Sequence, residues 1–425
     1  MKKSVLILSA LTIVVFCFCF QSCKKESDVL TGSDYVVLAW NNLGMHCLNP
    51  TYDQLVILPP YNTIYAQVIK RGNPPEVITD GIKVKFRIID NTYSYGKREY
   101  SGFWDYSDPL FGTVIEHDKG LTGNGLSGEM VISGDQFVIE GIPIVPVTDN
   151  DTWNPFQVAE ITVEDQSGTV LIQTRATVPT SDEINCAGCH GENAFEDILT
   201  KHDASNGTNL LGSQPVLCAS CHPSPALGTP GTGEKYLSEA IHGFHADKDA
   251  TCYDCHPGQT TKCNRSLDHT ADNGNCTTCH GELSEVAGSI AQGRIPWESE
   301  PKCVTCHTGV EGVDTGNDLY RNSTGHGGIG CPACHGSPHA MYPSRESSDN
   351  YQPIQYQDFA NKIKTIGSCG YCHNSSRGAE NDIGEFSEVH GGSSPEHYNA
   401  CHVCHTVVPS STSRWPHSYT WTNSN

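Results

Sequence analysis

The sequence predicts a mainly β N-terminal domain, an antiparallel sandwich, followed by a domain of loops and short helices. Segments rich in Val, Ile, Thr and aromatic residues, separated by turn residues, fill residues 31–180. Residues 181–425 instead carry eight copies of a Cys-x-x-Cys-His motif. Only 37% of the 425 residues are apolar, while 41 are glycine and 24 are proline. Side chains alone would therefore give this chain a thin core.

The first 22 residues form a predicted signal peptide of the lipoprotein type, and residues 23–30 a linker. Two lysines precede the apolar run VLILSALTIVVFCFCF, and polar sequence follows at once, which is typical of an export signal. Ser22 precedes Cys23 as in a lipoprotein cleavage box, so we expect lipidation at Cys23. The alternative is simple cleavage near Ser22 and release. We expect an exported, outer-membrane lipoprotein that faces the periplasm or the cell exterior.

Five segments of the region 31–180 have the composition of strands. Turn residues separate them, among them GNPP, TDG, GNG, SGD and DNDTWNP. Several strands at this spacing favour an antiparallel sandwich, which would serve for docking or assembly. The expected strand segments are residues 34–40, 62–72, 82–90, 129–141 and 156–178.

The repeated motif is the one that attaches c-type haem. Two thiols, two residues apart, add to the two vinyl groups of the porphyrin, and the following histidine becomes the proximal ligand of the iron. The predicted thioether cysteines are Cys186, Cys189, Cys218, Cys221, Cys252, Cys255, Cys276, Cys279, Cys303, Cys306, Cys331, Cys334, Cys369, Cys372, Cys401 and Cys404. The predicted proximal ligands are His190, His222, His256, His280, His307, His335, His373 and His405.

Zinc and disulfides are the competing explanations of the paired cysteines. Zinc sites combine ligand pairs into fours and do not require a histidine after every pair. A disulfide between cysteines so close would be strained and would leave eight histidines unexplained. We therefore expect eight covalent haem c groups, about 27 residues apiece between Cys186 and His405. So little protein for each macrocycle implies that residues 181–425 form an octahaem domain whose interior is largely haem.

Each iron needs a second, distal ligand if it is to be closed to substrate. The chain has 20 histidines, and most of the twelve that are not proximal lie near a motif. The distal candidates are His46, His202, His242, His245, His326, His339, His390 and His417, with His269, His397 and His402 as rivals to the last.

Two cysteines lie outside both the signal region and the motifs. Cys47 and Cys263 are expected to form a disulfide in an oxidising compartment, which would join the β domain to the haem domain. Cys47 ends the segment NNLGMHC, in which Met45 and His46 precede it. A copper or other metal site there is the alternative to His46 as a distal haem ligand.

The chain resembles a family of exported octahaem c-type cytochromes with an N-terminal β domain. The resemblance covers nearly the whole mature chain and rests on AWNNLGMHC, GIPIVPVTDNDTWNPF, CYDCHPGQTTKC, GRIPWESEPKC, CPACHGSPHAMYPS and RWPHSYTW. It implies electron transfer through stacked haems, each with two histidine ligands, in respiratory or extracellular electron transfer. More distant relatives include octahaem enzymes acting on nitrite, hydroxylamine or tetrathionate.

Three function classes follow from these observations. If every iron has two histidines, no position is open for substrate, and the protein moves electrons. One open iron would instead make it a reductase or oxidoreductase of the kind found among the distant relatives. A subunit of a cytochrome filament is the third class. The absence of a Cys-x-x-Cys-Lys motif and the regular form of all eight copies favour the electron-transfer protein over the enzyme.

The net charge of −22 at pH 7 argues against nucleic acid as a partner, because phosphates would repel such a chain. Residues 181–425 hold 13 Lys and Arg against 28 Asp and Glu, a net charge of −15. Haem propionates would add further carboxylates. We therefore expect basic redox partner proteins, with an outer-membrane electron-transfer complex or self-assembly as the setting and the lipid as membrane anchor.

Overall fold

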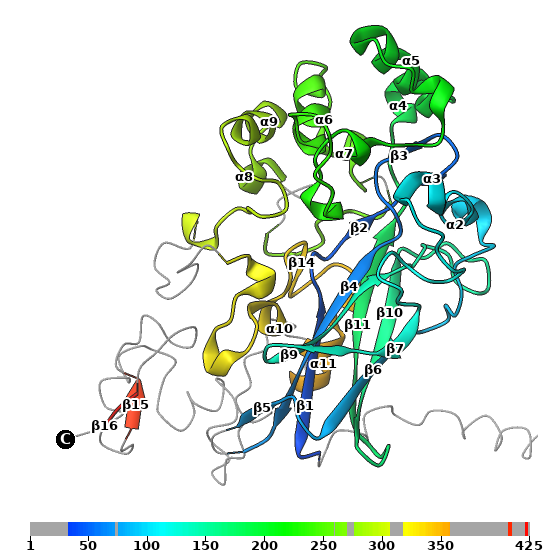
Figure 1. Ribbon diagram of the computed structural model, residues 1–425. Helices are drawn as coiled ribbons and strands as arrows, with labels where there is room; N and C mark the ends of the chain where they lie inside the picture. The colour runs from blue at the N-terminus through cyan, green and yellow to red at the C-terminus, as the bar shows by residue number, and fades with distance from the viewer. Residues whose placement is uncertain are drawn as a thin grey trace, which may run out of the picture. The chain divides into compact units, whose positions relative to one another are not determined.

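The computed structural model describes residues 33–72, 75–258, 260–269, 276–306, 318–357, 407–409 and 421–423. The chain divides at Asp34, and the described residues from Tyr35 onward belong to one compact unit. Strands dominate this unit up to Ser181, and short helices follow (Figure 1). The mainly β character predicted for the N-terminal region is therefore confirmed. The signal segment and Cys23 lie outside the described residues.

The first sheet has five strands, all paired antiparallel. Strands β1 and β4 are buried along nearly their whole length, so both of their faces are covered. Covered faces explain why β1 reads as a continuous rather than an alternating apolar run. The strand order is β1 (Tyr35–Asn41), β4 (Asn62–Lys70), β9 (Gln136–Ile142) and β8 (Val131–Ser133), with β5 (Glu76–Ile78) paired to β4.

The second sheet also has five strands and is antiparallel except for one short parallel pair, β2 with β11. Strand β10 alternates buried and half-buried residues, the period-2 pattern of a sheet with one covered face. Its order is β2 (His46–Cys47), β11 (Val170–Ser181), β10 (Phe156–Asp165), β6 (Ile82–Ile88) and β7 (Ser127–Glu129). Strand β1 of the first sheet lies against β11 of the second.

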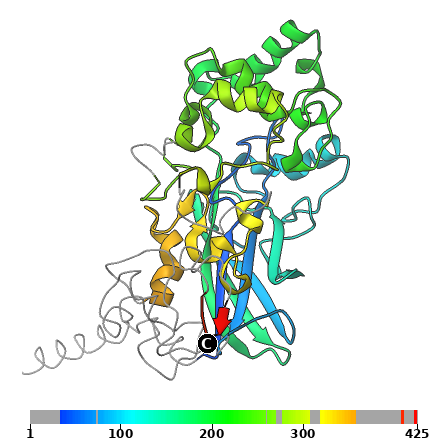
Figure 2. The same cartoon turned by 90° about the vertical axis from the view of Figure 1, so that its left-hand side faces the viewer.

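The outer edge of β1 is covered by α11 (Tyr351–Gln357), a helix from the C-terminal part of the chain. Ala39 N donates to Gln352 Oε1 at 2.8 Å, and Gln352 Nε2 donates back to Ala39 O. The Tyr356 hydroxyl contacts Val37 N at 3.1 Å and Val37 O at 2.6 Å. Figure 2 shows this segment, in orange, beside the strands. Side chains thus satisfy backbone groups that an edge strand would otherwise expose.

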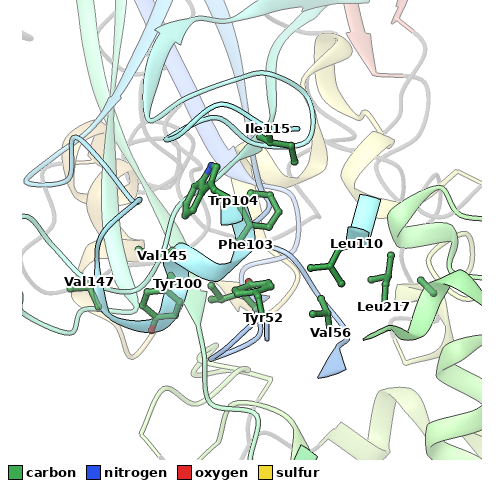
Figure 3. Close-up of a cluster of buried hydrophobic side chains, with 12 residues drawn as sticks. Tyr52, Val56, Tyr100, Phe103, Trp104, Leu110, Ile115, Val145, Val147 and Leu217 are labelled. Atoms are coloured by element: carbon green, nitrogen blue, oxygen red, sulfur yellow. The ribbon is translucent and has the colours of Figure 1, made fainter. Parts of the chain in front are cut away.

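A buried cluster joins the β region to the second Cys-x-x-Cys-His motif (Figure 3). Phe103 and Trp104 of α2 (Gly102–Asp105) lie in one cluster with Leu217 and Ala219 of the motif segment. Strand β12 (Val216–Leu217) also pairs in parallel with β3 (Leu55–Val56). The boundary predicted between residues 180 and 181 falls at the end of β11, but this core crosses it. The division into a β domain and a haem domain stays a prediction.

The remaining elements are short. The α-helices are α3 (Ser107–Phe111), α4 (Ala187–His190), α5 (Ala194–Asn206), α6 (Leu237–His245), α7 (Cys252–Cys255), α8 (Cys276–His280), α9 (Leu283–Ala291) and α10 (Cys331–His335). The 3-10 helices are η1 (Arg98–Ser101), η2 (Leu211–Ser213), η3 (Cys218–Ser220), η4 (Pro225–Leu227), η6 (Cys303–Thr305), η7 (Tyr320–Asn322), η8 (His326–Gly328) and η9 (Ser347–Asn350). The last strands are β13 (Gly336–Ser337), β14 (Ala340–Met341), β15 (Val407–Pro409) and β16 (Trp421–Asn423).

Candidate haem centres

Each motif that the structure describes forms a single helical turn. In the first, His190 N donates to Cys186 O at 3.0 Å, and His222 and His256 make the same bond in the second and third motifs. A helical turn sets residues i, i+3 and i+4 on one side, so both thiols and the histidine of a motif face the same way. The described motif cysteines form no disulfides. His307 and the motifs at residues 369–373 and 401–405 lie outside the described residues.

Four motif histidines each lie opposite a histidine predicted as a distal ligand. Each pair is separated by a similar distance, although the partners come from different elements. The ring centres are 6.4 Å apart for His190 and His245, 6.4 Å for His222 and His202, 6.1 Å for His256 and His242, and 6.1 Å for His280 and His339.

This separation fits two imidazoles that share one iron. Metal–imidazole bonds are about 2 Å long and the ring centre lies about 1 Å beyond the nitrogen, so the two centres stand about 6 Å apart. Stacking between rings in direct contact would bring near-parallel centres closer, as for Tyr95 and His117 at 3.5 Å. The donor set and its spacing therefore fit haem iron at these four motifs.

Hydrogen bonds at Nδ1 orient most of the paired rings. A carbonyl oxygen can only accept, so each such contact places the proton on Nδ1 and leaves Nε2 for a metal. These contacts are His242 Nδ1 to Ser238 O at 2.7 Å, His245 Nδ1 to Ile241 O at 2.8 Å, His339 Nδ1 to Leu43 O at 2.9 Å and His222 Nδ1 to Lys235 O at 3.0 Å.

Helix α6 supplies two of these rings to two different motifs. His242 and His245 are three residues apart, and they lie opposite the third and the first motif histidines, respectively. Helix α6 packs against α9, which follows the fourth motif. One short helix therefore connects two centres that lie 66 residues apart in the sequence.

Burial keeps several of these rings neutral. It lowers the pKa of His256 and of His339 to about 4, and it lowers the pKa of His242 as well. Neutral imidazole is the form that binds a metal, because its free nitrogen lone pair is the ligand.

His46 has a different environment from the paired histidines. It follows a turn in which Asn41 Oδ1 accepts from Gly44 N at 2.7 Å, and Gly44 has a φ of +83° that favours glycine. His46 Nε2 lies 2.6 Å from Asn42 Oδ1, and burial lowers the pKa of His46 to about 4. No motif histidine of the described residues is found opposite its ring.

The other distal candidates are less fully described. His326 is the first residue of η8. His390, His417, His397 and His402 lie outside the described residues. His269 Nδ1 lies 3.3 Å from Ser266 Oγ.

Cys47 and Cys263 lie near each other as free thiols. Burial, and after it the neighbouring Cys263, raises the pKa of Cys47, and burial raises the pKa of Cys263 to about 12. Ser181, which pairs with Cys47 in the sheet, contacts Thr261 Oγ1 through its hydroxyl at 2.9 Å. The segment that carries Cys263 is thus anchored beside β2, and the disulfide stays a prediction.

Thiols of different motifs also lie close together. Burial, and after it the Cys252 thiol, raises the pKa of Cys276 to about 11. Burial, and after it the Cys255 thiol, raises the pKa of Cys186 to about 11. Burial, and after it the Cys306 thiol, raises the pKa of Cys279. The third motif therefore lies beside both the first and the fourth, and the fourth beside the fifth.

Sequence reasoning missed the groups that hold the rings. The acceptors at His222, His242, His245 and His339 are backbone carbonyls, which no residue type reveals. Two acceptors are side chains: His190 Nδ1 lies 2.6 Å from Asp197 Oδ2, and His202 Nδ1 lies 3.0 Å from Thr208 Oγ1. An acidic residue in the first turn of the helix after a motif, as Asp197 is, was the available signal.

Comparison with known proteins finds cytochromes. Residues 285–336 match the family described as "Cytochrome c554 and c-prime", a stretch that includes the motifs beginning at Cys303 and Cys331. The "C-type polyheme cytochrome OmcC" of Geobacter sulfurreducens (strain ATCC 51573 / DSM 12127 / PCA) is 22% identical over 254 residues, which are 52% of this chain and 29% of that protein. These matches and the motifs support a multihaem c-type cytochrome.

The motifs and these matches together support covalent binding of haem c and a role in electron transfer. The chain spans less than a third of the length of the curated relative. The match to the crystal structure of MtrC from Shewanella baltica OS185 covers 75% of this chain and 46% of MtrC, at 14% sequence identity. Its TM-score of 0.15 is too low to show a common fold. Among the described residues, no helix is long and apolar enough to cross a membrane.

Proposed function

We propose that this protein carries eight haem c groups and passes electrons along them, with two histidines on every iron. The main support for this proposal is the set of four imidazole pairs, whose ring centres are 6.1–6.4 Å apart. Bound haem c supplies reversible one-electron exchange at its iron. The chain would attach each group through two thiols and orient most of the paired rings through Nδ1.

The ring pairs also support a specific ligand assignment. His245 serves the motif of His190, His202 that of His222, His242 that of His256 and His339 that of His280. With both axial positions filled, none of these four irons has a position for substrate. The neighbouring thiols of the first, third, fourth and fifth motifs support haems close enough to exchange electrons directly.

Two measurements on the purified holoprotein test the proposal. Intact-mass spectrometry should show the cleaved chain plus eight haems, and metal analysis should show no stoichiometric zinc. Electron paramagnetic resonance of the oxidised protein should show low-spin ferric iron throughout. A high-spin signal that responds to nitrite, hydroxylamine or tetrathionate would overturn electron transfer in favour of catalysis at an open haem. A mass short of eight haems would contradict the count.

The setting completes the proposal. We place the cytochrome outside the cytoplasm, anchored by lipid on Cys23 to the outer membrane, where it exchanges electrons with basic redox proteins. The export signal and the net charge of −22 support this setting. Mass spectrometry of the N-terminal peptide decides the anchor, because a diacylglyceryl group on Cys23 and an unmodified, released N-terminus give different masses.

A further inference from the structure

The ring of His190 differs from the other paired rings in what it contacts. His190 Nδ1 lies 2.6 Å from Asp197 Oδ2, in an ion-pair geometry. Among the paired rings, the partners recorded within the described residues are otherwise backbone carbonyls and hydroxyls. His245, on the opposite side of the same proposed iron, donates to the neutral carbonyl of Ile241 at 2.8 Å.

The carboxylate of Asp197 is itself held in place. Lys201, one turn further along α5, contacts the same Oδ2 atom. Asp197 follows the N-terminus of α5 by only a few residues, where a negative side chain is favourable. The side chain is about one-third exposed, so the contact with His190 is partly screened by solvent.

We propose that Asp197 lowers the reduction potential of the haem bound at Cys186 and Cys189, by accepting the Nδ1 proton of its ligand His190. This inference rests on the proposed axial role of His190. Oxidation removes one electron from the iron and leaves it more positive, which makes the ligand N–H more acidic. A charged acceptor strengthens the hydrogen bond most in that oxidised state, and the proton stays between Nδ1 and Oδ2. The ferric form is therefore favoured.

A lower potential would favour electron transfer from the haem of the first motif to its neighbours. A haem with a lowered potential gives up its electron more readily to its neighbours. The third motif is such a neighbour, because its Cys255 lies near Cys186 of the first. Helix α6 also carries the rings that lie opposite the histidines of the first and third motifs, so it would hold the two haems in a defined relation.

Three variants of the full holoprotein test this role. Asp197→Asn keeps an acceptor oxygen but removes the charge, so the ferrous-to-ferric ratio of one haem at fixed potential should rise about tenfold, or about 59 mV for a one-electron couple. Asp197→Glu should restore most of the wild-type value. Lys201→Ala frees the carboxylate from its second partner and should move the same potential downwards.

Glu196→Gln is the matched control, because it removes an identical charge from the neighbouring position, where the side chain is exposed. Redox titration followed by electron paramagnetic resonance assigns the shift to one low-spin signal. If even the wild-type protein lacks this low-spin signal or this haem, the proposed ligation by His190 is itself wrong. Eight low-spin haems with an unchanged titration in Asp197→Asn, or an equal shift in Glu196→Gln, would overturn this inference alone.

Discussion

At the scale of single residues, the paired imidazole rings differ in the angle between their planes. The planes of His190 and His245 meet at 76° and those of His202 and His222 at 85°. The planes of His242 and His256 meet at 11° and those of His280 and His339 at 26°. Hydrogen bonds at Nδ1 to backbone and side-chain acceptors orient six of these eight rings, so the protein contributes to the angles between them.

The angles predict two classes of low-spin signal in electron paramagnetic resonance. Near-perpendicular axial planes keep the iron d orbitals nearly degenerate, so the first two centres should give highly anisotropic signals with a large g value. The third and fourth should give ordinary rhombic signals. His339→Ala should remove one rhombic signal and create a high-spin one. His117→Ala is the control, since His117 stacks on Tyr95 instead. An unchanged spectrum in His339→Ala would contradict the assignment.

At the scale of elements, the motif turns are packed into their surroundings to different degrees. Ala219, between the cysteines of the second motif, is 0% exposed in the cluster with Leu217. Ala333 of the sixth motif is 1% exposed and packs with Trp40. Ala187 holds the same place in the first motif as Ala219 in the second, but it is exposed. The β region thus supports some centres directly.

A large side chain at Ala219 should therefore disturb the second centre. Ala219→Leu overpacks the cluster and should destabilise the protein by about 1–3 kcal/mol. Ala187→Leu should cost little, because solvent can accommodate the added atoms. Denaturant unfolding and the haem content of both variants provide the measurement. Equal effects of the two substitutions would show that the burial of Ala219 does not matter.

The covering of β1 by α11 gives a second prediction at this scale. Gln352→Ala leaves Ala39 N and O buried without partners, and should lower the free energy of unfolding by about 1–3 kcal/mol. Ile354→Ala in the same helix is the control, because Ile354 is 44% exposed. Chemical denaturation of the holoprotein measures both. A Gln352→Ala variant as stable as Ile354→Ala would contradict the role given to this helix.

At the scale of the whole molecule, the β region and the motif region are joined by many buried contacts. Arg265, 2% exposed, donates to Gly44 O at 2.7 Å and forms an ion pair with Asp349 at 2.9 Å. Gln67 Oε1 accepts from Gly330 N at 2.8 Å, next to the sixth motif. The bonds of Arg265 to Gly44 and of Gly330 to Gln67 join segments more than 200 residues apart.

The predicted Cys47–Cys263 disulfide would add a covalent connection between the same regions. Alkylation of the denatured but unreduced protein should leave both thiols unlabelled, and reduction should expose them. Cys47→Ser and Cys263→Ser should each destabilise the protein by about 2–4 kcal/mol, and the double variant by no more than either. Full labelling of both thiols without reduction would show that the bond does not form.

The charge of the molecule predicts how it meets its partner. Opposite charges raise the rate of encounter with a basic redox protein, and salt screens them over about 8 Å at ~0.15 M. The rate of reduction by a basic donor should therefore fall clearly as ionic strength rises. An acidic donor is the control and should show the reverse trend. A flat rate with the basic donor would mean that contact packing governs docking.

Much of the site was predictable because its chemistry is local. Cys276, Cys279 and His280 lie within one helical turn, so their spacing alone places thiols and ligand together. The strand segments were predictable for a similar reason, since β-branched residues and turn residues mark them along the chain. The acceptors at Nδ1 were not, because four of them are backbone carbonyls whose positions depend on the fold.

The sequence by itself determined the number of motifs and the acidic charge, and it predicted covalent haem attachment, an export signal and the β character of the first region. Each of these is a property of neighbouring residues or of composition. Only the tertiary structure decided which histidine stands opposite which motif. His339 lies 59 residues after His280, and His202 precedes His222. It also decided that α11 covers β1 and that Asp197 contacts His190. Such pairings depend on how distant segments pack together, and no local pattern records that.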